Sequence, residues 1–516
     1  MPVTEAALEK SVDGAGLLSR LPLHDVTVHF VREDDMMSLT TQQAANIQPE
    51  LKGNLGLFHL FFTVMAWNAP LVIVFAAIPI IVGYGNGIGA AGAFIAAGAT
   101  IGLFAIGFTR MTKILPSPGA FYAYITAGLG KRLGLGSGLL TLVGYFAAYS
   151  GTFAFGGIVS NQLFHDTLGL PELPWYLWGT ILWLIVAVLG LLKFSLSATL
   201  LTVFLGLEVL IIVIYDIAVF VQGGAAGTIS AEPLLPTTWT DGSVAMAMLF
   251  AIGMFGGFEI TALFRSEVRN PERTVPAATY MVVIVATLMY ALTSWAFINA
   301  AGLNEAVALA AEDPTGTMHA TFLAFGGKLL FDISSALVFT STFAVILAGH
   351  NIVSRYLFNL GADGILPKQL SKVHAKQGSP YRASLVASLA CLAVNIPAIL
   401  ANVDPTSFYA AMLGMTSLVL IVILFICNGA ILAFLHKNGR SRFSFFPRVI
   451  APGLAAIGLG ICAYLAITNF NSLTGGSQTL STALMVFLGA VFVGGILMAA
   501  AYKRTKPEVY ARIGRQ

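Results

Sequence analysis

Long apolar runs separated by short polar segments make up most of the chain from residue 55 onward. A helix needs about 20 apolar residues to cross the roughly 30 Å hydrocarbon core of a bilayer. Twelve runs are long enough, and the pattern therefore predicts an all-α integral membrane protein with about 12 transmembrane helices. The predicted spans are residues 55–82, 89–112, 136–163, 175–192, 196–221, 243–264, 277–301, 329–360, 383–402, 408–434, 449–469 and 479–502.

Two of these runs are interrupted near their middle. The first contains AWNAPL at 66–71, where Pro70 lacks a backbone N–H and restricts the residues before it. The sixth contains GMFGGFE at 253–259, where two glycines precede Glu259. A helix that breaks within hydrocarbon leaves backbone groups unpaired, which is tolerated where protein or a water-lined cavity satisfies them. Proline and glycine also occur in membrane helices as kinks and packing contacts, so a purely structural role for either break stays open.

The two breaks lie at corresponding positions, five helices apart. Matching interruptions of this kind are typical of transporters built from inverted repeats, with the binding site between the broken helices. The pattern predicts a first repeat at 55–221 (helices 1–5) and a second at 243–434 (helices 6–10). Helices 11 and 12, at 449–502, follow the repeats.

The positive charges lie almost entirely on one side of the predicted spans. With the N-terminus inside, every one of the 27 Lys and Arg residues except Lys328 falls on the cytoplasmic side. Cytoplasmic segments of membrane proteins carry such an excess, so the bias supports both the helix count and the orientation. It predicts a multi-pass protein of the cell membrane with cytoplasmic tails at 1–54 and 503–516. Residues 1–54 lack the apolar core of a signal peptide.

Composition and motifs exclude several other classes of protein. Only 10% of the residues are charged, against roughly 25% in soluble domains, which makes a lipid bilayer the expected surroundings. No GxxxxGK[ST] segment is present, the three cysteines lie in apolar runs and the eight histidines are scattered. We therefore expect no enzyme, no cofactor, no metal site and no nucleic-acid partner. The sequence carries no signal for an oligomeric state.

Four segments, in chain order, are similar to motifs of the amino acid–polyamine–organocation (APC) permeases. They are SPGAFYAYITAGLG at 117–130, FGGFEITALFRSEVRNPERTVPAA at 255–278, NIVSRYLFNLGADGILP at 351–367 and SPYRASL at 379–385. The resemblance covers about residues 50–505. It implies a five-plus-five inverted repeat of the LeuT-like type with broken helices 1 and 6. It also implies uptake of amino acids, polyamines or related amines, by proton coupling or exchange.

The chain departs from this family pattern at three places. A proline-containing break stands where a glycine-rich one is common, and in this it is similar to a subset of the family that includes putrescine importers. Ser266 and Glu267 stand where two glutamates are usual at the exit of the sixth helix. Glu208 stands where many members carry a lysine in the fifth helix, which leaves the coupling mechanism open.

The breaks would supply partners for both charged groups of a free amino acid. N–H groups at the start of a half-helix suit a carboxylate, and carbonyls at the end of the preceding half suit an ammonium group. Glycine permits close backbone approach, and phenylalanine forms walls or a gate, unless it makes ordinary core or lipid contacts. The predicted substrate-binding residues are Ala66, Trp67, Asn68, Ala69, Leu71, Phe255, Gly256, Gly257, Phe258, Glu259 and Tyr149.

Two carboxylates are candidates for proton coupling, Glu208 and Glu259. Glu208 lies in the apolar stretch VFLGLEVLIIVIY, where burial disfavours its charged form. A protonated carboxyl that only bonds a neighbouring helix is the alternative. Glu259 begins the second half of helix 6, so it is a candidate for substrate or proton binding, or for capping its own half-helix. Asp216 is expected to be solvated near the outer interface.

Ser341 and Thr342 in the eighth helix are weak candidates for a sodium site. In sodium-coupled relatives of this fold, hydroxyls at this place face carbonyls of the first break. Packing, or back-bonding to the helix, is the alternative.

The sequence as a whole predicts a secondary active transporter that imports amino acids by proton symport. The alternatives are an importer of polyamines such as putrescine, an amine exchanger, or a sensor of amino acids that does not transport.

Overall fold

The computed structural model describes residues 55–514, with gaps at 116–119, 193–197, 375–378 and 475–476. The predicted N-terminal tail at 1–54 and the end of the predicted C-terminal tail lie outside the described residues. Every regular element in the described part is a helix, apart from a parallel β-bridge that pairs Leu55 with Val268. This bridge joins the start of the first predicted span to the exit of the sixth.

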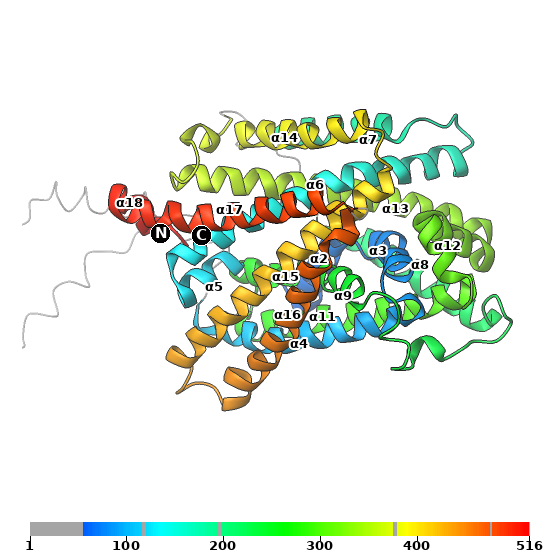
Figure 1. Cartoon of the computed structure of the whole chain (residues 1–516), viewed down its shortest axis with the longest axis horizontal. Coiled ribbons are helices and arrows are strands. Elements are labelled where there is room, and N and C mark those ends of the chain that lie inside the picture. Colours follow the sequence, from blue (N-terminus) through cyan, green and yellow to red (C-terminus); the bar gives the residue numbers. More distant parts are fainter. Residues whose placement is uncertain (1–54, 116–119, 193–197, 375–378, 475–476, 515–516) are drawn as a thin grey trace, which may run out of the picture. The chain divides into compact units, whose positions relative to one another are not determined.

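The longer elements run through the chain in the order shown in Figure 1. They are α2 (Leu57–Asn68), α3 (Pro70–Tyr84), α4 (Ala90–Ile114), α5 (Ala120–Leu129), α6 (Lys131–Asn161), α7 (Trp175–Leu191), α8 (Ala198–Gln222), α9 (Val244–Gly253), α10 (Ile260–Leu263), α11 (Pro271–Ala301), α12 (Ala306–Glu312), α13 (Pro314–Ala362), α14 (Tyr381–Leu400), α15 (Pro405–Asn438), α16 (Ala451–Thr468), α17 (Gln478–Thr505) and α18 (Pro507–Arg512). Short 3-10 or π segments are η2 (Gly87–Gly89), η3 (Gln162–Thr167), η4 (Glu232–Leu234), η5 (Phe264–Glu267), η6 (Lys368–Ser371), η7 (Phe446–Ile450) and η8 (Phe470–Thr474).

The described part contains nine helices that are long and apolar enough to cross a membrane, or ten if the bent pair α2 and α3 is one span. The two remaining predicted spans, 175–192 and 243–264, contain the shorter apolar helices α7 and α9. The predicted all-α membrane fold is thereby confirmed. The count of twelve and the inverted repeat stay predictions.

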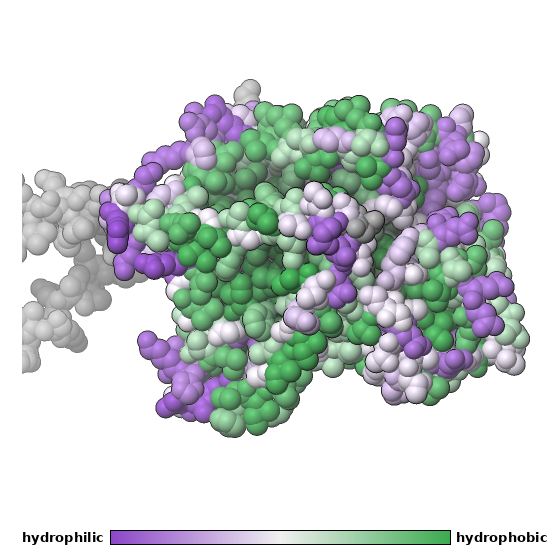
Figure 2. Space-filling view, in the orientation of Figure 1, coloured by the Kyte–Doolittle hydropathy of each residue, from purple (hydrophilic) through white to green (hydrophobic). Residues whose placement is uncertain are grey.

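The surface of the molecule fits this environment. Figure 2 shows apolar side chains over the middle of the visible face and hydrophilic residues gathered toward its ends. Many leucine, isoleucine and valine side chains on α7, α8, α14, α16 and α17 are exposed. In water such a surface would be unfavourable, whereas lipid tails solvate it without cost.

Three helices outside the predicted spans were not anticipated from the sequence. α5 and α12 lie between spans, and α18 follows the last one. The Lys131 side chain holds α18 in place by donating to the carbonyls of Tyr510 and Ala511 at 2.9 and 2.7 Å. α13 is longer than the predicted span because it includes an N-terminal segment, which a non-helical Gly327 (φ 71°) separates from the rest.

Four helices form a layer of their own with a separate apolar cluster. α7 and α14 lie along one side of α6 and α13 (Figure 1). Their shared cluster includes Tyr149 and Phe153 from α6, Leu182 from α7, Ile346 from α13 and Ala387 from α14. We call these four helices the scaffold layer. The remaining spans share a second and larger core, to which both broken helices belong.

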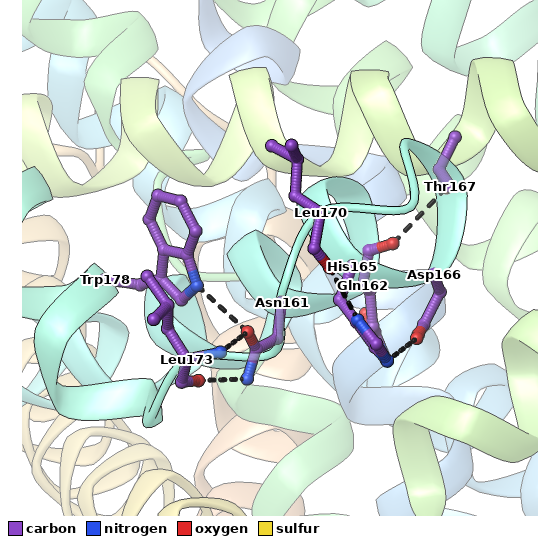
Figure 3. A network of polar contacts seen from close by, with 8 residues as sticks. All are labelled: Asn161, Gln162, His165, Asp166, Thr167, Leu170, Leu173 and Trp178. Carbon is purple, nitrogen blue, oxygen red and sulfur yellow. Dashed lines mark hydrogen bonds and ion pairs between the residues drawn. The ribbon is translucent and has the colours of Figure 1, made fainter.

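A polar network fixes the connection between α6 and α7 (Figure 3). The Asn161 amide donates to the Leu173 carbonyl at 2.6 Å, and its oxygen accepts from the Trp178 indole N–H at 2.9 Å. The His165 ring lies 2.7 Å from the Leu170 carbonyl. One asparagine thus ties the end of α6 to the loop and to the first turn of α7, which sets how α7 packs in the scaffold layer.

Close contact between α6 and α17 depends on two glycines. A Cβ added at Gly495 would lie 2.7 Å from the Gly136 Cα, whereas one added at the adjacent Gly494 would meet nothing within 4 Å. Small residues at such crossings let membrane helices approach closely and gain packing contacts.

Gly495→Ala should therefore lower the unfolding temperature, because overpacking of a close interface costs about 1–3 kcal/mol. Gly494→Ala is the matched control, and it should be neutral or stabilise the helix by up to about 1 kcal/mol. Thermal unfolding of the two detergent-purified variants is the measurement. Equal unfolding temperatures would show that the α6–α17 contact does not need a glycine at 495.

Candidate functional site

The first break lies between α2 and α3. Asn68 ends α2 and Pro70 begins α3, and the two halves bend by 46°. Ala69 between them has a left-handed backbone with φ 44° and ψ 70°. For a residue with a Cβ this conformation costs roughly 1–2 kcal/mol, so surrounding contacts must hold it.

The second break spans residues 254–259, between α9 and α10. Its backbone forms a series of tight turns, and Gly257 takes a φ of 106° that favours glycine. The Glu259 carboxylate folds back to accept the Gly257 N–H at 2.9 Å, and it accepts the Tyr145 hydroxyl of α6 at 3.2 Å. It makes no capping bond to α10. Glu259 thus joins the break to α6 instead of capping the half-helix that follows.

A cavity of about 200 Å³ lies between the two breaks. α6 and α13 of the scaffold layer and α15 also contribute residues to its lining. The lining residues are Asn68, Ala69, Val72, Ile73, Phe121, Thr141, Gly144, Tyr145, Ala148, Tyr149, Gly151, Thr152, Gly253, Met254, Gly256, Gly257, Glu259, Val345, Ala348, Gly349, Tyr409, Leu413, Thr416, Val419, Leu420 and Ile423. Among these described residues Glu259 is the only carboxylate, and there is no Lys, Arg or His.

Asn68 is the polar side chain of the cavity with unmet bonding capacity. It is 8% exposed, and neither its amide nitrogen nor its amide oxygen has a hydrogen-bond partner among the described residues. A buried amide without partners costs roughly 1–3 kcal/mol. Such a group next to a cavity is explained most simply by a ligand that supplies the missing partners.

Glu208 lies behind the first break. It is 5% exposed, and its Oε2 accepts the Leu71 N–H at 3.2 Å. That N–H belongs to the first turn of α3, where the helix dipole favours negative charge. Ser341 of α13 lies beside the carboxyl. Glu208 of α8 is therefore bonded to α3 and faces α13 at the level of the break.

Comparison with known proteins decides the family. Residues 55–498 match the family described as "Amino acid permease". The chain belongs to this family. The match confirms the family resemblance read from the four sequence motifs.

Individual relatives of the permease are distant. The low-affinity putrescine importer PlaP of Escherichia coli (strain K12) is 25% identical over 58% of this chain, and the matched part spans 65% of PlaP. The branched-chain amino acid permease BcaP of Bacillus subtilis (strain 168) is 25% identical over 66% of this chain and 74% of its own. The lysine-specific permease LysP of Lactococcus lactis subsp. cremoris (strain MG1363) is 24% identical over 64% of this chain and 66% of its own.

Six of the predicted substrate-binding residues of the permease meet at the cavity. They are Asn68, Ala69, Gly256, Gly257, Glu259 and Tyr149. Ala66 and Trp67 belong to α2, but their side chains lie outside the described part of the chain.

Leu71, Phe255 and Phe258 differ from the prediction. The Leu71 N–H is bonded to Glu208, and the Leu71 side chain is fully buried away from the cavity. Phe255 is buried and does not line the cavity. Phe258 packs edge-on against Phe104, Phe108 and Phe121 instead of forming a gate. Apolar side chains next to a break are drawn into the core as readily as toward a ligand.

Asp216 and the two hydroxyl candidates can also be placed. The expectation that Asp216 is solvated is wrong, because it is 9% exposed and accepts the Thr293 hydroxyl at 2.9 Å. The α8–α11 contact covers it. Ser341 lies beside Glu208, and the Thr342 hydroxyl is buried without a partner among the described residues. No group of three or more His, Cys, Asp or Glu in the described part is arranged to hold a metal ion.

Residues of α6 and α15 in the cavity wall were missed. On α6, Gly144, Ala148 and Gly151 recur at spacings of four and three, and on α15 Tyr409 and Leu413 begin a similar stripe. These spacings mark one face of a helix. In helices that are apolar on every side, the face that lines a cavity is hard to recognise from the sequence. The small residues at 144, 148 and 151 of α6 were nevertheless a usable signal for that face.

Asn68→Leu should weaken binding of amino acids or amines at least about tenfold without lowering the unfolding temperature, because the amide it removes has no partner to lose. Asn428→Leu is the contrasting control, since the Asn428 amide donates to the Pro452 carbonyl at 2.7 Å. That variant should lose stability by about 1–3 kcal/mol and keep its binding. Thermal unfolding and ligand binding of both variants are the measurements. A large loss of stability in Asn68→Leu would mean that the amide is a structural group.

Proposed function

We propose that this permease is a secondary active transporter that imports amino acids across the cell membrane by proton symport. Both termini lie in the cytoplasm in this proposal, as the distribution of Lys and Arg predicts. The observation that carries the proposal is the cavity between two helix breaks, lined by an unpartnered Asn68 amide and a buried Glu259 carboxylate.

The lining favours a neutral amino acid with an aliphatic side chain. Glu259 attracts the ammonium group, and the Asn68 amide has a donor and an acceptor for the polar end of the ligand. The rest of the wall carries aliphatic side chains: Val72, Ile73, Val345, Leu413, Val419, Leu420 and Ile423. A branched apolar side chain would replace water against this surface, which is favourable by roughly 25 cal/mol per Å².

Glu208 couples the proton to substrate in this proposal. Its carboxylate and the carboxylate of an amino acid would compete for the positive end of α3, because one helix N-terminus carries only about half a unit charge. Protonation of Glu208 removes its negative charge and leaves the dipole to the substrate. Proton and substrate then bind together, which is the requirement for symport.

Glu208→Gln, which imitates the protonated carboxyl, should separate transport from the proton gradient. In proteoliposomes, accumulation of radiolabelled L-leucine driven by an inward proton gradient should fall at least about fivefold, while exchange of leucine across the membrane persists. Asp216→Asn is the matched control, a second buried carboxylate on α8 that should leave gradient-driven uptake unchanged. Gradient dependence equal to wild type in Glu208→Gln would remove Glu208 from the coupling. A sodium requirement in the wild type would replace the proton.

A diamine importer is the second candidate function. Two observations favour it: the cavity lining has one carboxylate and no cationic side chain, and PlaP is among the relatives. A diamine brings no carboxylate, so it needs no free N–H at α3.

Competition separates the two candidates. Uptake of radiolabelled L-leucine should be inhibited by L-isoleucine and L-valine at concentrations at least about tenfold lower than by putrescine or L-lysine, because the aliphatic wall gives a second ammonium group no partner. The reverse order would identify the protein as a polyamine importer. If wild-type proteoliposomes take up neither leucine nor putrescine in a saturable way, the proposed function is wrong.

A further inference from the structure

His350 is a fully buried histidine at the centre of the scaffold layer. It lies on α13, and it is not among the residues that line the cavity. Its Nε2 lies 2.9 Å from the Ser384 hydroxyl of α14, and its Nδ1 lies 3.3 Å from the Tyr149 hydroxyl of α6. Ser354, one turn further along α13, is 3.5 Å from Nε2. Both ring nitrogens therefore have partners, and the partners come from two neighbouring helices.

Tyr149 connects this histidine to the cavity. Tyr149 is among the residues that line the cavity, yet it is 1% exposed and its ring packs in the apolar cluster of the scaffold layer. The tyrosine and imidazole rings meet edge to face with centroids 5.6 Å apart. On the backbone side, a Cβ added at Gly349 would come within 3.3 Å of the Tyr149 Cβ. The Tyr149 hydroxyl thus meets His350, with Ser388 and Cys391 of α14 beside it, and the Tyr149 Cβ meets the bare backbone of α13.

The fourth scaffold helix reaches the same histidine from behind. Gly190 of α7 is buried, and a Cβ added there would overlap His350 Nε2 and lie 3.1 Å from the Ser384 hydroxyl. All four helices of the layer therefore meet at this imidazole: α6 through Tyr149, α7 through Gly190, α14 through Ser384 and α13 through its own backbone.

We propose that His350 is a positioning residue that fixes the Tyr149 ring in the cavity wall and so sets the affinity for substrate. The proposal rests on the proposed transport function. A neutral imidazole has one donor and one acceptor nitrogen, which matches two hydroxyl partners on opposite sides of the ring. The hydrogen bonds of His350 to Tyr149 and Ser384 hold Tyr149 in one orientation relative to α13 and α14. They thereby fix the shape of the cavity wall at Tyr149.

Amide variants distinguish the two bonds. An asparagine amide lies as many bonds from the backbone as Nδ1, whereas a glutamine amide lies as many as Nε2. His350→Asn can keep a partner for Tyr149, and His350→Gln can keep one for Ser384. If the Tyr149 bond is the one that matters, asparagine should preserve substrate affinity better than glutamine.

The first experiment compares these variants by equilibrium binding of L-leucine and of putrescine to purified protein, and by uptake into proteoliposomes. His350→Gln should raise the Kd and KM about tenfold with kcat within about twofold, and His350→Asn should stay within about threefold of wild type. His319→Gln is the control, a buried histidine on the segment of α13 before Gly327, whose Nδ1 lies 3.0 Å from the Thr315 carbonyl and whose ring packs on Phe75 and Phe331, which do not line the cavity. It should leave the Kd unchanged even if it lowers stability.

A double-mutant cycle tests the route through Tyr149. Tyr149→Phe removes the hydroxyl, so adding His350→Gln should raise the Kd by no more than about twofold further. Gly190→Ala, which displaces the imidazole without changing a polar group, should raise the Kd as His350→Gln does. Gly102→Ala on α4 is its control, because a Cβ there meets nothing within 4 Å.

The outcomes separate the two proposals. Binding of leucine or putrescine by wild type, with equal Kd values in His350→Gln and Gly190→Ala, overturns the positioning role alone. Effects of His350→Gln and Tyr149→Phe that multiply in the double variant overturn the route through the tyrosine. No binding of either probe by wild type overturns the transport proposal and this inference with it. If His350→Gln fails to fold, the asparagine and Gly190→Ala variants still decide the question.

Discussion

The demand that every backbone N–H and C=O find a partner in hydrocarbon governs this structure. Helices pair these groups along most of each span. Backbone groups that need other partners therefore occur where a helix ends or breaks. At both breaks the missing partners come from side chains that are themselves buried carboxylates. Glu208 takes the Leu71 N–H behind the first break, and Glu259 takes the Gly257 N–H within the second. The charges most expensive to bury are thus placed where unpaired N–H groups and helix dipoles favour them most.

The two carboxylates, Glu208 and Glu259, have different surroundings. Glu259 lines the cavity and has Tyr145 as its second partner. Glu208 does not line the cavity, and its carboxylate accepts the Leu71 N–H of α3. One can meet a ligand and the other can sense it through α3. In the proposed mechanism, substrate binding at the cavity and protonation of Glu208 both act on the N-terminus of α3.

Much of the architecture follows from the sequence because its causes are local. Apolar length identifies the spans, and Pro70 and the glycine pair at 256–257 identify the breaks. Proline has no N–H for the helix, and glycine adopts backbone angles that a helix does not use. The side-chain assignments succeeded less evenly. Asn68 and Glu259 reach the cavity as expected, since a polar group in hydrocarbon has few other places to go. Phe258 and Asp216 lie elsewhere than expected because whether such a residue faces core, cavity or a neighbouring helix depends on helix rotation, which apolar periodicity barely constrains in a helix buried on all sides. Leu71 was predicted for its backbone N–H, and Glu208 occupies that N–H.

Ala69 gives the first break a character that the second does not share. Glycine at 257 adopts its positive φ at almost no cost, so that turn stores no such strain. Alanine at 69 does not, and its turn survives only while neighbours hold it in place. The bond from Glu208 to the Leu71 N–H, the first N–H after that of Ala69, is such a hold. The first break therefore stores backbone strain that a carboxylate hydrogen bond holds in place, whereas the second break is unstrained. The backbone strain next to the cavity is therefore concentrated at its α2–α3 end, and the α9–α10 end carries none of this kind.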